Sequence, residues 1–313
     1  MQSKREKIKD QKTLLVLLVL ILISSIFVRG FFNIHNFINL LIQVSIYGIT
    51  ACGMTFAIIS GEFDLSVGST MTIAGLLSVI LEPQIGQIPA ILAALVFALL
   101  VGLVNGILIA RFNISSFIVT IGMQYIVKGI ALRICDGRPV QSTNAWFGML
   151  GNMTIGKLPV MVLVMIVCVL ITAYVLKQTG FGRNVYTIGG NREVAYFSGI
   201  KVVSNKITVF MIAAFTAAVA GILNASRLNT GAATHGDALA LSVITGVVIG
   251  GTSLTGGVGS IGKSIVGILL LNVLSNVLDL LRVYSYYQTA VRGILLIIII
   301  AYESYHVHQL KNA

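Results

Sequence analysis

The stretch Ile88–Ala110 reads IPAILAALVFALLVGLVNGILIA and contains no charged side chain. An α-helix needs roughly 20 consecutive apolar residues to cross the hydrocarbon core of a bilayer, so this stretch predicts a transmembrane helix. Similar apolar runs recur from Leu14 to Ala301. They do not alternate between apolar and polar residues, which excludes a membrane β-barrel. The fold class predicted is therefore an all-α polytopic membrane protein.

The composition supports this class. Charged residues make up 10% of the 313 residues and hydrophobic residues 57%, whereas soluble domains carry roughly a quarter charged residues. The net charge of +11 does not indicate a nucleic-acid partner, because the basic residues stand in the connections between apolar runs. That distribution is the one that orients a membrane protein.

We predict about ten transmembrane or partly re-entrant helices, within a range of about 8 to 10. The third and the eighth are shorter than a full crossing, so we expect them to be broken or re-entrant. The first is preceded by five basic residues but lacks a small-x-small cleavage site, so it is expected to be a membrane helix and not a signal peptide. The predicted spans are Thr13–Val28, Phe37–Ile59, Val67–Leu81, Ile88–Ala110, Ser115–Ile134, Leu158–Leu176, Ile207–Leu228, Leu239–Gly251, Ile261–Leu281 and Gln288–Tyr302.

The charges between the spans predict an orientation. Residues 177–206 carry five basic residues against Glu193 alone, which places this segment in the cytoplasm together with both termini. The loop 135–157, which contains Trp146, then faces outside. We expect residues 1–313 to form one transmembrane domain with a cytoplasmic segment at about 179–206.

A nucleotide-binding motif is present but lies in an unsuitable context. GVGSIGKS, residues 257–264, matches the phosphate-loop pattern GxxxxGK[ST]. A working phosphate loop joins a strand to a helix in an α/β core, and although Val243–Ile249 superficially resembles such a strand, no polar interval approaches the roughly 50 residues that a domain needs. We therefore predict no enzyme activity here, and expect the glycines to form a tight turn on the cytoplasmic side.

No metal site or cofactor is expected. The three cysteines, Cys52, Cys135 and Cys168, show no CxxC spacing, and the four histidines are scattered. Packed thiols inside apolar runs account for two of the cysteines.

The cytoplasmic segment contains a predicted short helix. Asn191 is a candidate N-cap for a helix over Arg192–Ser198, and Gly199 is a candidate terminator. Glu193, Ala195 and Gly199 also match E-x-A-x-x-x-G, a degenerate form of the EAA loop of ABC importer permeases. In those permeases the loop engages the ATPase subunit.

The resemblance extends beyond this loop. Gly61–Ser69 (GEFDLSVGS), Thr179–Ile200 and Gly250–Ser260 (GGTSLTGGVGS), with the spacing between them, resemble the permease subunit of sugar-importing ABC transporters. The branch is the one that takes up ribose, xylose, galactose and related sugars. Two departures, Glu62-Phe63 and Val258, bear on which sugar is carried and not on the family.

The resemblance implies a set of partners and a location. The chain would form the path for a small sugar in the bacterial cytoplasmic (inner) membrane, with a second copy of the permease beside it in the lipid bilayer. An external solute-binding protein would deliver the sugar, and a separate ABC ATPase subunit would hydrolyse ATP. The residues implied in ATPase coupling are Asn191, Arg192, Glu193, Ala195 and Gly199.

Candidate residues for the substrate path lie in two places. Asp64 and Ser66 stand at the start of the short third span, where Asp64 either hydrogen-bonds sugar hydroxyls or caps a helix starting at Leu65. Asn272 and Asn276 share one helix face, where they either line the path or hydrogen-bond to another helix.

Other intramembrane polar residues are assigned structural or open roles. Asp279 is expected to pair with Arg282 one turn on or with Arg292 on the last helix. Gln124 and Lys128 form an i, i+4 pair whose role stays open.

Two alternatives to the sugar importer remain at this stage. The same architecture carries nucleosides or branched-chain amino acids in related permeases. An ion-coupled secondary transporter is also polytopic and glycine-rich, but such carriers usually place ionisable residues deep in their spans. Here the 10 acidic residues mostly lie near predicted span ends.

Overall fold

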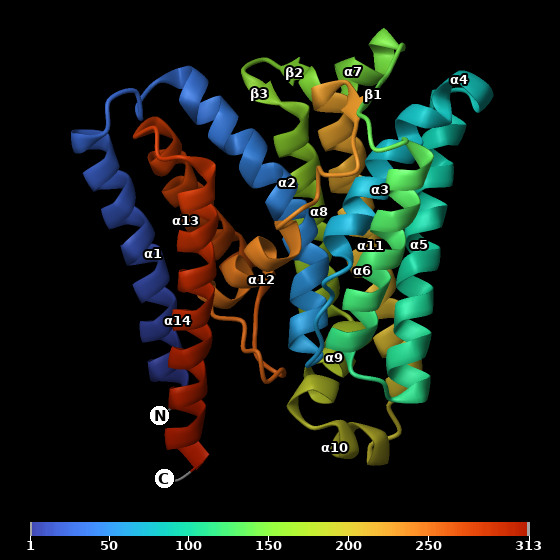
Figure 1. Cartoon of the computed structure of the whole chain (residues 1–313). Helices are drawn as coiled ribbons and strands as arrows, with labels where there is room; N and C mark the ends of the chain where they lie inside the picture. The colour runs from blue at the N-terminus through green and yellow to red at the C-terminus, as the bar shows by residue number, and fades with distance from the viewer. Residues whose placement is uncertain (1, 312–313) are drawn as a thin grey trace.

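The computed structural model describes the backbone of residues 2–311 and the side chains of residues 13–298 and 301. The described residues form fourteen helices and two short antiparallel strand pairs, β1 with β4 and β2 with β3 (Figure 1). The elements are α1 (Gln2–Phe27), α2 (Ile34–Ile59), α3 (Val67–Ile80), α4 (Glu82–Ile85), α5 (Gln87–Phe112), α6 (Ser116–Ile134), β1 (Val140–Gln141), α7 (Ala145–Asn152), β2 (Thr154–Ile155), β3 (Leu158–Pro159), α8 (Val160–Gln178), α9 (Gly180–Gly190), α10 (Arg192–Phe197), α11 (Val202–Leu228), β4 (Thr230–Gly231), α12 (Leu239–Ile249), α13 (Ile261–Leu280) and α14 (Ser285–Lys311).

Six described helices are long and apolar enough to cross a membrane: α2, α5, α6, α8, α11 and α13. Three shorter apolar helices accompany them, namely Thr13–Phe27 within α1, α3 and α12. The tenth predicted span lies within α14. The prediction that the third and eighth segments are too short for a full crossing agrees with the lengths of α3 and α12, which have 14 and 11 residues.

The connecting segments lie at opposite ends of the bundle. In Figure 1 the helices α9 and α10 lie at the end where α1 begins and α14 ends. The strands β1 to β3 and helix α7 lie at the other end. The structure therefore separates the segment 179–206 from the loop 135–157, as the charge pattern predicts. We call the α10 end the coupling end and the α7 end the opposite end.

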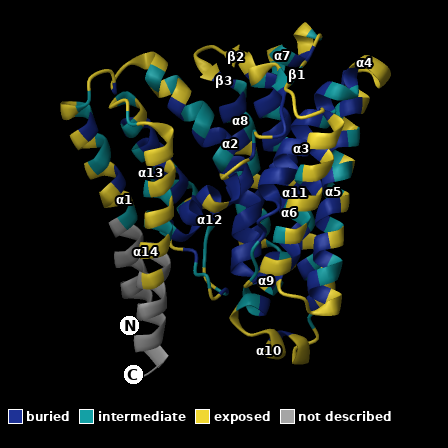
Figure 2. Cartoon of the chain, viewed as in Figure 1, coloured by how far each residue is buried: buried dark blue, intermediate teal, exposed yellow. Residues whose placement is uncertain are grey.

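The centre of the bundle is formed by α2 and α11 (Figure 2). Of the 18 most apolar consecutive residues in each helix, 83% are buried in α2 and 61% in α11. In the peripheral helices α6 and α8, only 22% of the most apolar 18-residue stretch is buried, and aliphatic side chains such as Ile118 and Leu170 are exposed. Small residues allow the central helices to approach. A Cβ on Gly102 of α5 would lie 2.6 Å from the carbonyl oxygen of Phe210 on α11. Residues 102–106 of α5 read GLVNG, a GxxxG pattern, and this pattern is a packing seam.

The two short helices α3 and α12 each follow a non-helical segment, residues 60–66 and 232–238, and the second of these segments packs against the first half of α3. The backbone nitrogen of Gly236 donates to Thr72 Oγ1 at 2.9 Å. A Cβ on Gly68 would lie 2.5 Å from the carbonyl oxygen of Gly236. Two broken segments are thus joined inside the bundle, where non-helical backbone is tolerated because protein covers it.

The structure also settles the context of GVGSIGKS. The residues Val243–Ile249, which superficially resemble a strand in the sequence, lie in helix α12. Gly256 and Gly257 adopt φ values of +83° and +73°, which glycine adopts without steric cost. Lys263 lies in the first turn of α13. The motif is a glycine turn between two helices, as predicted, and lacks the strand of a phosphate loop.

Candidate functional site

The short helix at the coupling end forms as predicted. The side chain of Asn191 accepts a hydrogen bond from the Val194 nitrogen at 3.0 Å and caps α10. The helix ends at Phe197, with Ser198 as its C-cap. Gly199 follows with φ +77°, the left-handed conformation that commonly terminates helices.

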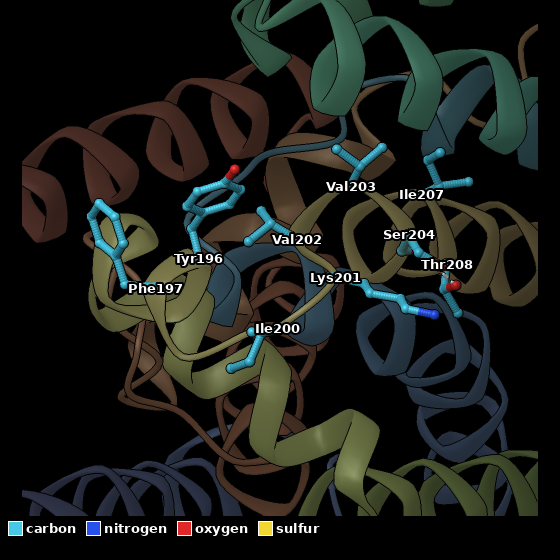
Figure 3. A pocket seen from close by; sticks show the side chains of 10 residues that line it. Tyr196, Phe197, Ile200, Lys201, Val202, Val203, Ser204, Ile207 and Thr208 are labelled. Carbon is cyan, nitrogen blue, oxygen red and sulfur yellow. Dashed lines mark hydrogen bonds between the residues drawn. The ribbon is translucent and has the colours of Figure 1, made fainter.

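Helix α10 attaches to the bundle through one small residue and exposes large apolar ones. Ala195 is fully buried and packs in a cluster with Ile188 and Val202. In contrast, Tyr196 is 70% and Phe197 85% exposed. An open groove of ≈ 830 Å³ runs from these residues along the first turns of α11 (Figure 3). Exposed apolar surface of this kind on a polar end of a protein typically binds another protein.

Two of the predicted coupling residues are charged. Arg192 donates to the side chain of Asn113, which is the C-cap of α5. This bond ties α10 to the turn between α5 and α6. Glu193 lies exposed in the first turn of α10, where a carboxylate interacts favourably with the helix dipole.

Backbone contacts join the end of α9 to two other segments. A Cβ on Gly189 would lie 1.7 Å from the carbonyl oxygen of Ile59, the last residue of α2, and 2.7 Å from the nitrogen of Gly257. The Tyr186 hydroxyl donates to the Gly259 carbonyl at 2.8 Å. Burial raises the pKa of this hydroxyl, so it remains a donor. We call the contact of Ile59, Gly189 and Gly257 the glycine contact. Gly189 precedes the first residue of α10, Arg192, by three positions, so the contact links α10 closely to the loop that follows α12.

A buried ion pair lies beside this contact. Lys206 of α11 pairs with Glu62, and their side chains are 7% and 13% exposed. Glu62 belongs to one of the sequence departures from the sugar-permease pattern, but the sequence offers no signal that identifies Lys206 as its partner. A charge that is this deeply buried requires an opposite charge nearby.

Asp64 and Ser66 lie in a second buried cluster. Asp64 Oδ1 accepts from the Ser66 nitrogen at 2.9 Å and from Ser66 Oγ at 2.6 Å. Helix α3 therefore begins at Val67, two residues after the predicted start at Leu65, and Asp64 stabilises the turn that leads into it. Asn105 of α5 donates to Ser66 Oγ at 2.9 Å. The sequence flags this asparagine only as a middle residue of a GxxxG, so its polar role is missed.

Asn272 and Asn276 do not share a common polar partner. Asn276 and Asn36 of α2 exchange two hydrogen bonds, of 3.0 and 2.7 Å, which is an interhelical contact. Asn272 donates to the carbonyl of Ile268 in its own helix at 2.8 Å. It also borders a cavity of ≈ 30 Å³ together with Arg292, which is a space for about one water molecule.

The expected pairing of Asp279 requires correction. None of the three ion pairs found among the described side chains contains Asp279. Its carboxylate accepts from Gln288 Nε2 at 2.7 Å, and Arg292 donates instead to Ser275 Oγ at 3.0 Å. The backbone nitrogen of Arg282, which has a φ of +58° in the turn that ends α13, donates to the backbone carbonyl of Asp279 at 2.9 Å. The Asp279 carboxylate and the Arg292 guanidinium thus each hydrogen-bond to a neutral side chain instead of to each other.

The structure gives Lys128, which the sequence spacing pairs with Gln124, a different partner. Lys128 of α6 forms an ion pair with Asp237, at 2.7 Å between Nζ and Oδ1. Asp237 precedes α12 by two residues and lies far from Lys128 in the sequence. Within the part of the chain that the structure describes, no three His, Cys, Asp or Glu side chains gather as metal ligands do.

Comparisons with known proteins identify the family of the chain. A family model described as "Branched-chain amino acid transport system / permease component" matches residues 36–300. The ribose import permease protein RbsC of Escherichia coli (strain K12) is 36% identical over 306 residues, which cover 94% of each chain. The L-arabinose transport system permease protein AraH of the same strain is 36% identical over 301 residues, covering 96% of this chain and 92% of the relative.

A third relative carries the transporter class in its name. The L-arabinose ABC transporter permease protein AraH of Azospirillum brasilense is 34% identical over 296 residues, covering 94% of this chain and 87% of the relative. No solved structure matches the chain. The chain belongs to the permease family described as branched-chain amino acid transport system / permease component.

Proposed function

We propose that this chain forms the translocation path of an ATP-driven importer for a small sugar, a pentose or hexose, delivered by an external solute-binding protein. The observation that carries the proposal is the full-length similarity to permeases named for ribose and L-arabinose, over 94% and 96% of this chain. Both names denote neutral polyols, in contrast to the amino acids in the family description.

The chain is a transport subunit and not an enzyme, as its relatives are permeases. ATP hydrolysis in such an importer takes place in a separate ATPase subunit. The position of GVGSIGKS supports this division. The motif lies in the turn between helices α12 and α13, whereas a nucleotide-binding phosphate loop follows a β-strand.

The proposed topology has about ten membrane segments, of which α3 and α12 are broken or re-entrant. The coupling end lies in the cytoplasm with both termini, and residues 1–313 form one domain of the bacterial cytoplasmic membrane. The basic residues of the coupling end support this orientation; they include Arg111, Lys177, Arg183, Arg192, Lys201 and Lys263.

The proposed coupling site is α10. An ATPase subunit would bind the exposed surface of Tyr196 and Phe197, while Asn191, Arg192, Glu193, Ala195 and Gly199 hold the helix in place. Movement of α10 would reach the loop after α12 through the glycine contact. Because a pair of ATPase subunits needs two coupling surfaces, two copies of the chain would form the path.

Uptake into proteoliposomes tests the proposal. The chain is reconstituted with its ATPase subunit, and uptake of labelled ribose and L-arabinose is measured with the solute-binding protein outside. We expect uptake that requires ATP in the compartment of α10 and the solute-binding protein in the other. Uptake by the chain alone, driven by an ion gradient, would contradict the proposal and support a secondary transporter. Uptake of a branched-chain amino acid or nucleoside in place of both sugars would overturn the cargo assignment only.

A further inference from the structure

The ion pair of Lys128 and Asp237 is open to its surroundings, unlike the other polar contacts inside the bundle. The two side chains are 33% and 51% exposed. For comparison, the side chains of the Lys206–Glu62 pair are 7% and 13% exposed, and Asp64 is fully buried. The third ion pair, Arg133–Asp136, is a highly exposed i, i+3 pair at the end of α6.

The pair lies at membrane depth. Lys128 stands about 9 Å along α6 from the end of that helix at Ile134, at 1.5 Å per residue. Asp237 follows Gly236, whose nitrogen binds Thr72 of α3. Thr72 stands about 12 Å along α3 from its end at Ile80. Figure 1 shows the segment before α12 descending from the opposite end into the middle of the bundle.

The surface around the pair contains polar and small residues beside apolar ones: Leu132, one turn after Lys128 on α6, is 41% exposed, and Leu241 on α12 is 51% exposed. On the flank of α6 that carries Lys128, Gln124 lies one turn before it and is partly exposed. Thr234 and Ala238, on the segment before α12, are exposed as well. On the other flank of α6, at the same depth, Ile126 and Ile130 are 58% and 37% exposed. At this level α6 therefore has one flank with exposed isoleucines and another flank on which two polar side chains, Gln124 and Lys128, stand one turn apart among apolar neighbours.

An exposed carboxylate at this depth cannot face acyl chains without a large cost, and intramembrane charges normally face a water-filled cavity or the bundle interior. Lys128 has three N–H donors and Asp237 two carboxylate oxygens. Their mutual contact uses one of each among the described residues. The remaining donors and acceptors suit a neutral polyol, whose hydroxyl groups both donate and accept.

We propose that Lys128 and Asp237, with Gln124 and Thr234, line the aqueous translocation path on the side of the bundle away from α10, and bind the hydroxyl groups of the passing sugar. The inference rests on the proposed function for the identity of the cargo, but not for the presence of water at this surface. The pair is neutral overall, which matches an uncharged cargo. Asp237 also stands two residues before α12, and the loop after this helix carries the glycine contact beside α10.

Thiol labelling tests water access. In a variant whose three native cysteines are replaced, single cysteines are introduced as Gln124→Cys and Thr234→Cys. The matched controls are Ile126→Cys and Ile130→Cys on the same helix. A charged, membrane-impermeant thiol reagent is added on the side of β1 and α7 to the importer in proteoliposomes. We expect Gln124→Cys and Thr234→Cys to be labelled at least tenfold faster than the two controls.

Sugar protection tests the binding role. Saturating substrate-loaded solute-binding protein, with ATP, should slow the labelling of Gln124→Cys, whereas sugar-free binding protein should not. Adding Asp237→Asn should raise the half-protecting sugar concentration about tenfold, as expected for one hydrogen bond to a charged group. A pair with only a structural role would lower the amount of folded protein and leave that concentration unchanged.

Three outcomes would overturn the inference. Equal labelling of all four positions would show that depth, and not a path, controls access. Absence of labelling at Gln124→Cys and Thr234→Cys would show a surface covered by lipid or by a second copy, and disulfide formation between copies at Thr234→Cys would identify the latter. Labelling without sugar protection would remove the binding role. If no sugar is transported at all, the proposed function is wrong. The difference in labelling between the two flanks of α6 is measured without transport and therefore tests water access independently.

Discussion

The backbone nitrogen of Gly257 donates a hydrogen bond of 2.8 Å to the carbonyl oxygen of Ile59, and a Cβ on Gly189 would lie 1.7 Å from that same oxygen. Three segments that are distant in the sequence thus touch at this point through backbone atoms. No flexible side chain separates them, so a displacement of one segment must move the others.

Gly189→Ala should therefore disrupt the coupling end. The added methyl group overlaps a backbone carbonyl, and we expect a loss of about 1–3 kcal/mol, the usual cost of overpacking, together with loss of ATP-driven uptake. The neighbouring Gly190 is the matched control, because a Cβ there meets nothing within 4 Å. Gly190→Ala should stay within about 1 kcal/mol of the wild type. Thermal unfolding in detergent and uptake in proteoliposomes measure both effects. Equal behaviour of the two variants would exclude the glycine contact from coupling.

Phe197→Ala should weaken binding of the ATPase subunit. Phe197 is 85% exposed at the coupling end, and truncation of a central aromatic residue in an interface costs about 2 kcal/mol or more, or roughly thirtyfold in Kd. The matched control is Phe32→Ala, since Phe32 is 83% exposed between α1 and α2 at the opposite end. Both variants should insert and unfold like the wild type. Titration of the purified permease with the ATPase subunit gives the Kd; unchanged binding by Phe197→Ala would remove α10 from the docking surface.

The sequence predicts the helices well because their signal is local. Each predicted span coincides with a helix of the structure and extends beyond it by at most two residues. The cap of α10 at Asn191 follows from a side chain that binds a backbone group three residues on. The predicted span Val67–Leu81 starts where α3 starts, but the helix from Leu65 that Asp64 would cap does not form, because Asp64 binds Ser66 before the helix begins.

Partners that are distant in the sequence are not predicted. Lys206 pairs with Glu62 and Lys128 with Asp237, and each pair joins segments whose approach depends on the packing of the whole bundle. The expected pairing of Asp279 with an arginine rests on helical spacing, but the structure offers Gln288 as a neutral donor at 2.7 Å. The spacing of residues along a helix determines which of them share a face. It does not determine which neighbouring element packs against that face.

Asn276→Ala distinguishes a structural role of this asparagine from a role in the path. The side chain exchanges two hydrogen bonds with Asn36, and such contacts between membrane helices average about 0.6 kcal/mol each. We expect Asn276→Ala and Asn36→Ala to destabilise the protein by about 1 kcal/mol each, and the double variant by little more than one of them. A double-mutant cycle from thermal unfolding measures this coupling. A changed KM for sugar uptake with unchanged stability would instead place Asn276 in the path.

The Lys206–Glu62 pair should be sensitive to loss of one partner and tolerant of loss of both. Lys206→Met leaves the Glu62 carboxylate, 13% exposed, without its partner, and breaking a buried pair in this way costs about 3–5 kcal/mol. Glu62→Leu should destabilise by a similar amount. The double variant Lys206→Met with Glu62→Leu removes both charges, and apolar replacement of a buried pair is often neutral. Thermal unfolding of the four proteins tests this, since additive losses in the double variant would show that each residue stabilises the coupling end independently of the other.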